Sequence, residues 1–340
     1  MDSPLLAEPG AVPGTGPDAG VAAHYGDPYA EQRGIAAGWG VIDASHRGVI
    51  KITGQDRLSW LHSLTSQDTE HLAPGASAQA LILDPQGHVE HELRLTDDGE
   101  AVWALVEPGA AGPLLGFLTS MRFMLRVEPA DVSGEYAVLT TIGPGRPAEG
   151  GIAVADSFEA NVIVPRADLA AQVAARRSAG AVLAGTWAHE ALRIAAGRAR
   201  FGLDTDHRSL PHELGWIETA VHLNKGCYRG QETVARVHNL GHPPRRLVRL
   251  LLDGSENRLP GHGDPVTLDD AQVGLTGSAA RHYELGPVAL ALVKRTVPVD
   301  ATLLAAGLPA AQEVIVAPDA GGEALETVRQ VRAGLLRPAR

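Results

Sequence analysis

The only cysteine in this 340-residue chain, Cys227, stands in the segment Lys-Gly-Cys-Tyr-Arg-Gly-Gln-Glu at residues 225–232, which we call the cysteine motif. Lys225 and Arg229 each lie two positions from the sulfur, and neighbouring cations favour the reactive thiolate form. The two glycines of the motif indicate a tight turn or a close approach of the backbone. Because a lone cysteine is commonly just a small buried apolar residue, a chemical role and a structural role both remain open.

The cysteine motif lies in the most basic part of an acidic chain. A short helix is expected over residues 232–240, ended by Gly241. Residues 221–250 carry six basic side chains and one acidic one, a local net charge of +5 in a chain whose net charge is −11. Such a patch suits a small polyanion, although an arginine-rich composition gives the same count without any function. The overall negative charge argues against general affinity for nucleic acid or anionic membranes.

The bulk composition, with 44% hydrophobic and 20% charged residues, is typical of a globular protein. A single cysteine excludes an intramolecular disulfide, and it excludes a four-thiolate iron–sulfur or zinc site built by one chain. No apolar run reaches about 18 residues, so we expect no membrane-spanning helix. The first basic residue is Arg33, which does not fit a secretory signal, and we therefore expect a cytoplasmic protein.

The sequence texture divides the chain into four parts. Residues 1–38 are rich in glycine, proline and alanine without periodicity, which predicts a flexible N-terminal tail. Residues 39–133 and residues 134–242 each mix strand alternation with helical spacing and are expected to form two α+β segments, the second of which contains the cysteine motif. Residues 243–340 show short strands separated by glycine and proline turns, which predicts a small all-β barrel.

The cysteine motif, followed by an Ala-Arg pair at residues 235–236, resembles the signature of the YgfZ branch of the folate-binding YgfZ/GcvT family. That family also contains the aminomethyltransferase T-protein of the glycine cleavage system. Residues 42–50, 192–204 and 273–278 resemble further blocks of the family, and the resemblance covers nearly all of residues 39–335. It implies a three-domain, ring-like arrangement of the α+β fold around a central opening in which tetrahydrofolate or another folate form binds.

A folate site needs a stacking surface, buried polar partners and a cation, because folate joins a flat pterin to an anionic tail. A helix expected to start at residue 186 carries Trp187, His189 and Arg193, the last two on one face. The resemblance also implies folate contacts near Arg47. The remaining candidate cofactor-binding residues come from the cysteine motif and its helix: Lys225, Tyr228, Gln231 and Arg236. The structural alternative places Trp187 in the core and pairs Arg193 with Asp204.

Residues 88–92, His-Val-Glu-His-Glu, form one arm of an expected hairpin. Their spacing does not match a metal-binding motif, so we expect an exposed strand face and no metal site. In the T-protein the corresponding place holds an Asp-Asp pair close to the folate nitrogen that accepts the one-carbon unit. Here the pair is His91-Glu92, and the longer glutamate shifts the carboxylate. The T-protein block Arg-Thr-Gly-Tyr-Thr-Gly-Glu is also missing at residues 157–161, so aminomethyl transfer is not favoured.

The resemblance implies a folate-binding protein that acts in iron–sulfur cluster assembly or repair, with iron–sulfur proteins or assembly factors as partners and an indirect effect on tRNA modification. Cys227 would carry the redox or cluster-handling chemistry. One thiol cannot hold a cluster alone, so any cluster would be transient or shared. The alternatives are a tetrahydrofolate-dependent methyl or aminomethyl transferase, and an RNA-associated module, which the 4% aromatic content disfavours. An accessory factor is favoured over a classical transferase, and the residues do not decide whether a reaction is catalysed.

Overall fold

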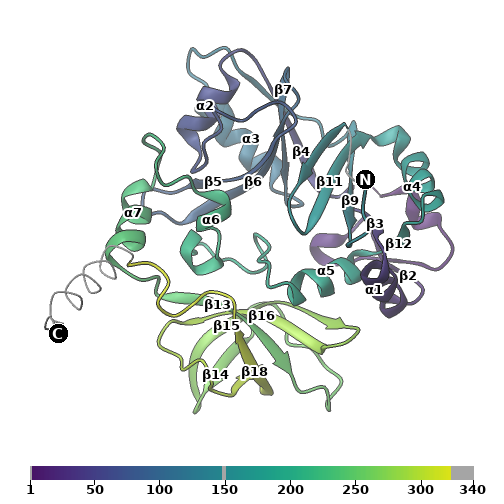
Figure 1. Cartoon of the computed structure of the whole chain (residues 1–340), viewed down its shortest axis with the longest axis vertical. Helices are drawn as coiled ribbons and strands as arrows, with labels where there is room; N and C mark the ends of the chain where they lie inside the picture. Colours follow the sequence, from purple (N-terminus) through teal and green to yellow (C-terminus); the bar gives the residue numbers. More distant parts are fainter. Residues whose placement is uncertain (1, 148–150, 323–340) are drawn as a thin grey trace, which may run out of the picture.

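The computed structural model describes residues 2–147 and 151–322. Within these residues the strands form two five-stranded sheets, a small two-stranded sheet and a closed six-stranded barrel. The two sheets lie beside each other on one side, the barrel lies on the other, and helices join them around the middle (Figure 1). The expected α+β class and the C-terminal barrel are confirmed.

The first sheet has the order β5-β6-β7-β4-β8 and is antiparallel throughout. Its strands are β4 (Gly48–Thr53), β5 (Ser77–Leu83), β6 (Val89–Asp97), β7 (Ala101–Val106) and β8 (Glu128–Asp131), and its helices are α2 (Arg57–Leu64) and α3 (Ala111–Ser120). Apolar residues at helical spacing, such as Leu61 on α2 and Leu114 and Leu118 on α3, pack against Leu93 and Leu95 on one face of the sheet. This burial fixes both helices on the side away from the second sheet.

The second sheet has the order β10-β11-β9-β3-β12. Its strands are β3 (Gly40–Asp43), β9 (Tyr136–Ile142), β10 (Ile152–Ala155), β11 (Glu159–Pro165) and β12 (Val182–Ala184), and its helices are α1 (Pro28–Ala37), α4 (Leu169–Ser178) and α5 (Thr186–Ala195). Strand β3 precedes the whole first sheet in the sequence, yet it lies between β9 and β12. The segment expected over residues 39–133 therefore contributes a strand to the second sheet. The two sheets contact each other through residues such as Val49 and Val138.

The expectation of a flexible tail over residues 1–38 is wrong for residues 2–38, which form η1 (Pro4–Ala7), β1 (Ala11–Pro13), η2 (Gly16–Asp18), β2 (Ala22–Tyr25) and α1. Leu5 and Val21 are buried in the core. Glycine and proline serve structured turns and caps here: Gly10 has φ 79°, and Pro28 starts α1 behind the capping side chain of Asp27. A composition typical of disorder therefore belongs to a tightly folded segment.

The barrel closes in the order β13-β16-β15-β14-β17-β18. Its strands are β13 (Arg245–Leu252), β14 (Pro265–Leu268), β15 (Ala271–His282), β16 (Gly286–Lys294), β17 (Leu303–Ala305) and β18 (Leu308–Val314). Val248, Leu250 and Val293 fill its interior. The part of the expected barrel after residue 322 lies outside the described residues.

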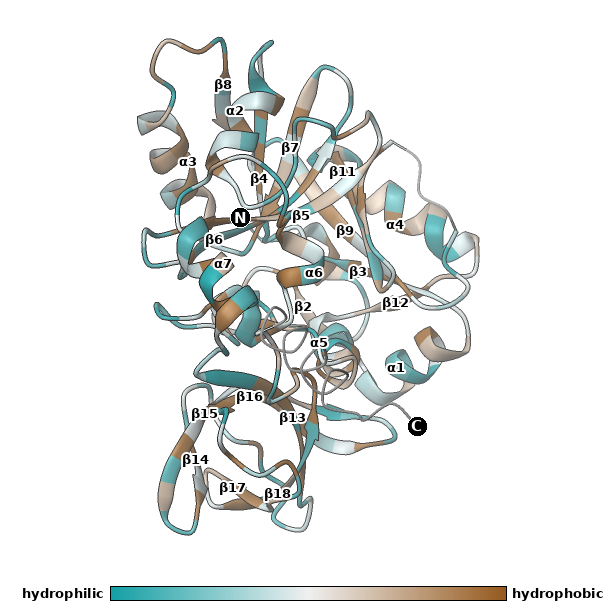
Figure 2. Cartoon of the chain, turned by 60° about the vertical axis from the view of Figure 1, so that its left-hand side comes forward, coloured by the Kyte–Doolittle hydropathy of each residue, from teal (hydrophilic) through white to brown (hydrophobic). Residues whose placement is uncertain are grey.

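A connecting segment runs from α5 to the barrel through η4 (Pro211–Leu214), α6 (Ile217–Ala220) and α7 (Gln231–Leu240). It returns to the first sheet, where Ser66 Oγ donates to the carbonyl of Ala220 at 2.6 Å. Gly230 has φ 82°, and a Cβ atom there would lie 2.5 Å from the carbonyl oxygen of Asp84. The close backbone approach expected of the cysteine motif is therefore confirmed at Gly230. Figure 2 shows hydrophobic residues along the sheet strands and mixed residues along α7.

Candidate functional site

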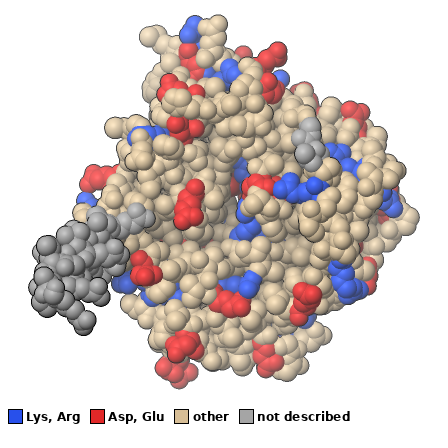
Figure 3. All heavy atoms as spheres, in the orientation of Figure 1, with Lys and Arg blue, Asp and Glu red and all other residues tan. Residues whose placement is uncertain are grey.

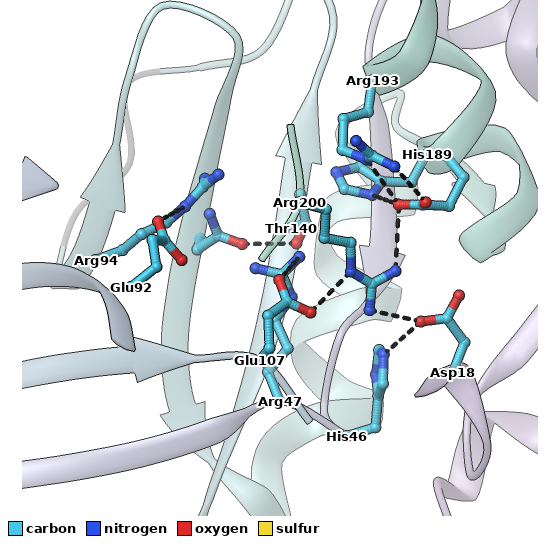
Figure 4. Close-up of polar contacts among 12 residues, drawn as sticks. Asp18, His46, Arg47, Glu92, Arg94, Glu107, Thr140, His189, Arg193 and Arg200 are labelled. Carbon is cyan, nitrogen blue, oxygen red and sulfur yellow. Dashed lines mark hydrogen bonds and ion pairs between the residues drawn. The ribbon is translucent and has the colours of Figure 1, made fainter. Parts of the chain in front are cut away.

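A group of charged side chains, most of them buried, lies where the two sheets, α5 and the N-terminal segment (residues 2–38) meet (Figure 4). We call this group the ionic cluster. It comprises Asp18, His46, Arg47, Glu92, Arg94, Glu107, Glu159, His189, Glu190, Arg193, Arg200 and Asp204. Glu92 and Arg94 share one face of β6 because they are two residues apart on a strand. Likewise, His189 and Arg193 share one face of α5 because they are four residues apart.

Glu159 on β11 joins the two sheets and α5 electrostatically. Its carboxylate lies 2.5 Å from Arg94 Nη1 and 2.6 Å from His189 Nε2. Burial by itself would raise the pKa of Glu159, but Arg94 and His189 hold it well below its usual range. Burial also opposes the charge on His189, yet the neighbouring Glu159 raises the pKa of His189 above its ordinary value. The geometry therefore favours an ionised carboxylate–imidazolium pair.

Arg193 has four hydrogen-bonding partners, one of which is the carbonyl of Arg198. It forms ion pairs with Glu190 at 2.7 Å and with Asp204 at 2.8 Å, and it donates to Ser278 Oγ at 2.6 Å. The structural alternative for Arg193 is therefore confirmed, since it pairs with Asp204 as that interpretation expected. Ser278 lies on β15, so this arginine also ties α5 to the barrel.

Arg200 connects the N-terminal segment to the rest of the ionic cluster. It lies 2.7 Å from Glu107 and 2.8 Å from Asp18, and Arg47 approaches Glu107 at 3.3 Å. His46 Nε2 lies 3.2 Å from Asp18. Burial opposes ionisation of Asp18, but His46 and Arg200 lower the pKa of Asp18 to about 2. Asp18 thus stays ionised through its contacts with these two residues.

Glu92 differs from its neighbours because burial outweighs its partners and raises the pKa of its carboxyl. Arg94 Nε is 3.5 Å away and Gln79 Nε2 donates at 3.0 Å, which offsets the burial only in part. Glu92 can therefore take up a proton more readily than an exposed glutamate. The expectation of an exposed strand face over residues 88–92 is wrong at Glu92, which is buried against the second sheet.

A central cavity of about 950 Å³ adjoins the ionic cluster. Figure 3 shows the hollow in the middle of the molecule with charged side chains at its edge. Arg94 of the ionic cluster lines the cavity, and so does Arg198, whose carbonyl accepts a hydrogen bond from Arg193. Trp216, a largely buried indole, adds an aromatic face to the cavity wall. This combination matches a ligand with a flat polar ring and an anionic tail.

His212 lines the central cavity and is only 5% exposed, yet neither of its ring nitrogens has a hydrogen-bond partner. Burial, with a smaller contribution from nearby His238, lowers the pKa of His212 to about 4, so the ring is neutral at physiological pH. Buried polar groups normally have partners, so this imidazole has hydrogen-bonding capacity for a ligand or water. These cavity residues fit a folate in chemical type.

The structure brings together only some of the residues selected from the sequence. Arg47, His189 and Arg193 all lie in the ionic cluster. Trp187 is 55% exposed beside His24, so it is not a core residue, and it is not among the described residues that line the central cavity. Trp216, and not Trp187, is the tryptophan that lines the central cavity among the described residues.

The cysteine motif is anchored through its lysine. Lys225 Nζ donates to the carbonyls of His62, Thr65 and Gln67 and lies 5.1 Å from the Tyr228 ring centre. Burial, opposed in part by Asp68, lowers the pKa of Lys225 to about 8. Tyr228 is buried, which raises its pKa to about 12. Both side chains thus hold the motif on the first sheet.

Cys227 itself is exposed. Arg229 pairs with Glu90 at 2.7 Å, and Arg236 pairs with Glu232 at 3.0 Å on α7, which Gln231 begins. The two cations expected to favour the thiolate, Lys225 and Arg229, therefore both have partners of their own. The thiol is nevertheless open to solvent and to a second molecule.

The basic residues of 221–250 do not form a free cationic surface. Arg245 pairs with Asp206 and Glu213, at 2.6 and 2.8 Å. Arg249 lies 2.6 Å from Glu313, and Arg246 is fully buried in the barrel. Acidic residues from other parts of the chain thus pair with Arg229, Arg245 and Arg249, and Arg246 is buried, which supports the compositional interpretation.

Sequence reasoning missed Arg94, Glu107, Glu159 and Arg200. One signal was available, because Arg94 lies inside a strand between buried apolar neighbours and Glu159 begins an otherwise mostly apolar strand. An inward-facing charge on such a strand needs a partner. Asp18 gave no such signal, since its segment was expected to be flexible. No group of three or more potential ligands is placed to hold a metal within residues 2–147 and 151–322.

Comparison with known proteins agrees with this architecture. Residues 24–148 match the family model described as the GCVT N-terminal domain. The crystal structure of the glycine cleavage system aminomethyltransferase T from Bartonella henselae superimposes with a TM-score of 0.75, covering 91% of this chain and 94% of that one at 18% identity. The fold is therefore that of the GcvT class. The resemblance of this chain to the YgfZ/GcvT-like family is confirmed, at low sequence identity.

Three relatives illustrate the range of similar proteins. A putative chloroplastic transferase of Arabidopsis thaliana is 26% identical over 286 residues, covering 72% of this chain and 64% of the relative. The mitochondrial iron-sulfur cluster assembly factor IBA57 homolog of Mycosarcoma maydis is 27% identical over 230 residues, covering 62% and 57%. An aminomethyltransferase of Nostoc sp. is 26% identical over 307 residues, covering 77% and 79%. The chain thus spans less than two thirds of the length of the first two relatives.

None of the helices in the described part of the chain has both the length and the apolar character needed to cross a membrane. Two of the relatives are named as chloroplastic and mitochondrial. The cytoplasmic location expected from the sequence stays a prediction.

Proposed function

We propose that this chain is a folate-binding protein that acts in the assembly or repair of iron–sulfur clusters. The central cavity carries the folate part of the proposal, because it combines Arg94, Arg198, Trp216 and the unpartnered His212. The assembly part is supported by the relative from Mycosarcoma maydis and by the exposed thiol of Cys227.

The cavity residues would divide the recognition of folate among them. The guanidinium groups of Arg94 and Arg198 would attract the anionic tail, and the indole of Trp216 would contact the flat ring. The neutral His212 would be left for the polar edge of the ring. Folate, when bound, supplies a carrier for one-carbon units. Glu92 can hold or release a proton at its carboxyl oxygen because its pKa is raised.

The cysteine motif would present a single thiolate to a cluster or to a partner protein. Cys227 is exposed on a segment that Lys225 and Gly230 hold against the first sheet. The backbone that carries the thiol is therefore fixed in position. One thiolate supplies one ligand, and the remaining ligands of a cluster would come from the partner. An effect on tRNA modification would follow indirectly, through enzymes that depend on such clusters.

Calorimetric titration of tetrahydrofolate tests the folate part. Arg198→Ala is a suitable variant because this arginine is partly exposed at the cavity wall, and Arg208→Ala, which removes an exposed arginine outside the cavity, is the matched control. We expect about a tenfold weaker binding for Arg198→Ala, since loss of one charged contact costs roughly 1.5 kcal/mol, and no change for Arg208→Ala. Equal binding by all three proteins would place the folate elsewhere.

The assembly part has its own test. In cells whose own copy is replaced by the Cys227→Ser variant, we expect the activity of iron–sulfur enzymes to fall as far as in cells without the protein. An unchanged activity would remove Cys227 from the proposal while leaving the folate result untouched.

A second candidate is a tetrahydrofolate-dependent methyl or aminomethyl transferase. The buried Glu92 with its raised pKa favours it, because proton transfer to a folate nitrogen needs a nearby acid or base. Here a Glu92→Gln variant would bind tetrahydrofolate normally and lose the transfer of the one-carbon unit. For an accessory factor, the same variant would keep its effect on iron–sulfur enzymes.

A further inference from the structure

A second pocket, of about 640 Å³, is separate from the central cavity, since no described residue lines both. It lies among the N-terminal segment, the β3–β4 turn, the start of α3, the β8–β9 turn and the residues after β11. Its polar and charged lining residues are Ser45, His46, Arg47, Asp131, Ser133 and Arg166. Arg47 also belongs to the ionic cluster, which therefore borders this pocket.

The N-terminus of α3 opens into this pocket without a cap. Ala110 at the N-cap position makes no side-chain hydrogen bond to the helix, and the first turn holds no acidic residue. Pro113 has no N–H, so the amides of Ala111 and Gly112 are the ones that the helix itself leaves unpaired. Ala111 and Gly112 both line the pocket. The positive end of the helix dipole thus faces the pocket unopposed.

Two side chains at the pocket carry nitrogen atoms that have no hydrogen-bond partner. The side chain of His46 is 8% exposed; its Nε2 contacts Asp18, while its Nδ1 has no hydrogen-bond partner. Arg166 uses Nη2 alone to reach the carbonyls of Ser45, Ser133 and Tyr136, and its Nε and Nη1 are buried without partners. Unpaired buried groups in a native fold commonly mark a missing water or ion. Here they come from two separate elements at the same pocket.

The charge balance and the backbone favour an anion. Asp131 is the only carboxylate among the described lining residues, and its Oδ1 already accepts from the amide and the hydroxyl of Ser133. The cationic side chains of the lining are Arg166 and Arg47, the second of which also pairs with Glu107. Four lining glycines have open space where a Cβ would be, so a ligand can approach the backbone there: Gly16, Gly109, Gly112 and Gly134.

We propose that this pocket binds the phosphate group of a small phosphorylated molecule, or free phosphate, between the first turn of α3 and the guanidinium groups of Arg47 and Arg166. A tetrahedral phosphate uses acceptors in several directions, which suits donors arriving from a helix end and from separate arginines. This site is independent of the proposed folate cavity, and the volume leaves room for a small organic group beyond the phosphate.

The α3 terminus offers a variant that blocks the site without damaging the fold. Gly112→Asp places a carboxylate at the helix N-terminus, where it competes with phosphate and also favours the helix. Gly116→Asp adds the same charge one turn later, at an exposed position with open space and outside the pocket. Gly112→Ala adds a methyl group at residue 112 without adding a charge.

Calorimetric titration with inorganic phosphate and with glycerol phosphate provides the test, with chloride as the reference anion. We expect millimolar or tighter binding of at least one phosphate compound to the wild type, weakened at least tenfold in Gly112→Asp. Gly116→Asp should bind as the wild type does, and Gly112→Ala should lose less affinity than Gly112→Asp because it adds a methyl group without a charge. Preference for glycerol phosphate would identify a phosphorylated molecule as the ligand, and equal affinity would identify the phosphate group alone. No binding by the wild type, or equal binding by all variants, would overturn the proposal.

Discussion

Glu92 and Glu159 both lie near Arg94. The pKa values of their carboxyls are nevertheless shifted in opposite directions. Arg94 Nη1 is 2.5 Å from Glu159, whereas its Nε is 3.5 Å from Glu92. The pKa of Glu159 is held well below its usual range, and the pKa of Glu92 is raised. The two carboxyls therefore differ in protonation: Glu159 stays ionised, and Glu92 can take up and release a proton.

The raised pKa of His189 makes part of the stability depend on pH. Its folded pKa lies above the ordinary value of 6.5, so its contribution is fully present below pH 6.5 and is lost as the pH rises through the folded pKa. We expect the free energy of unfolding in urea to fall over that range. His189→Gln should flatten this part of the profile, whereas His262→Gln, at an exposed position, should leave it unchanged. A profile of the same shape in all three proteins would show that His189 is not charged.

Two adjacent residues of the cysteine motif, Cys227 and Tyr228, are expected to contribute very differently to stability. Cys227 is exposed and Tyr228 is buried. We expect Cys227→Ser to change the free energy of unfolding by less than about 0.5 kcal/mol, and Tyr228→Ala to lower it by about 3 kcal/mol. Denaturant titration measures both. A large loss in Cys227→Ser would mean that the thiol is a structural group.

At the scale of elements, α5 is fixed by charge as much as by apolar contact. Arg193 joins α5 to Asp204 and to β15 of the barrel. Removing it leaves Glu190 and Asp204 with fewer partners in a buried setting. We expect Arg193→Ala to lower the free energy of unfolding by about 3 kcal/mol or more. Arg198→Ala, whose arginine is partly exposed, should cost less than about 1 kcal/mol in the same thermal or urea measurement. Similar losses of stability in both variants would contradict the claim that the buried contacts of Arg193 stabilise the fold more than those of Arg198.

Most elements could be predicted from the sequence because their patterns are local. The alternation in residues 48–53 and the spacing of Leu58, Leu61 and Leu64 correspond to β4 and α2. The folded structure of the N-terminal segment could not be predicted in this way, because it depends on contacts with residues far along the chain, such as Arg200. Similarly, the sequence located His189 and Arg193, but the inward orientation of Glu159 depends on how the two sheets pack.

At the scale of the molecule, Asp18 connects the N-terminal segment to the ionic cluster. Its pKa is lowered to about 2 from an ordinary 3.8, so its contribution is present above pH 3.8 and is lost as the pH falls through about 2. We expect Asp18→Asn to lower the free energy of unfolding by about 2 kcal/mol at neutral pH and to have no effect below pH 2. Asp300→Asn, at an exposed position, is the control. An equal cost for Asp18→Asn at both extremes of pH would point to lost packing instead of lost charge.

The contact between Asp18 and Arg200 joins residues 182 positions apart, which matters while the chain is being made. Ribosomes add about 5–20 residues per second, so the carboxylate of Asp18 exists for roughly 9 to 36 s before its arginine is synthesised. Until then, Asp18 lacks this partner, and the N-terminal segment cannot complete its native charge contacts. Residues near Asp18 are therefore made long before their final environment exists, and their native contacts depend on residues that are synthesised much later.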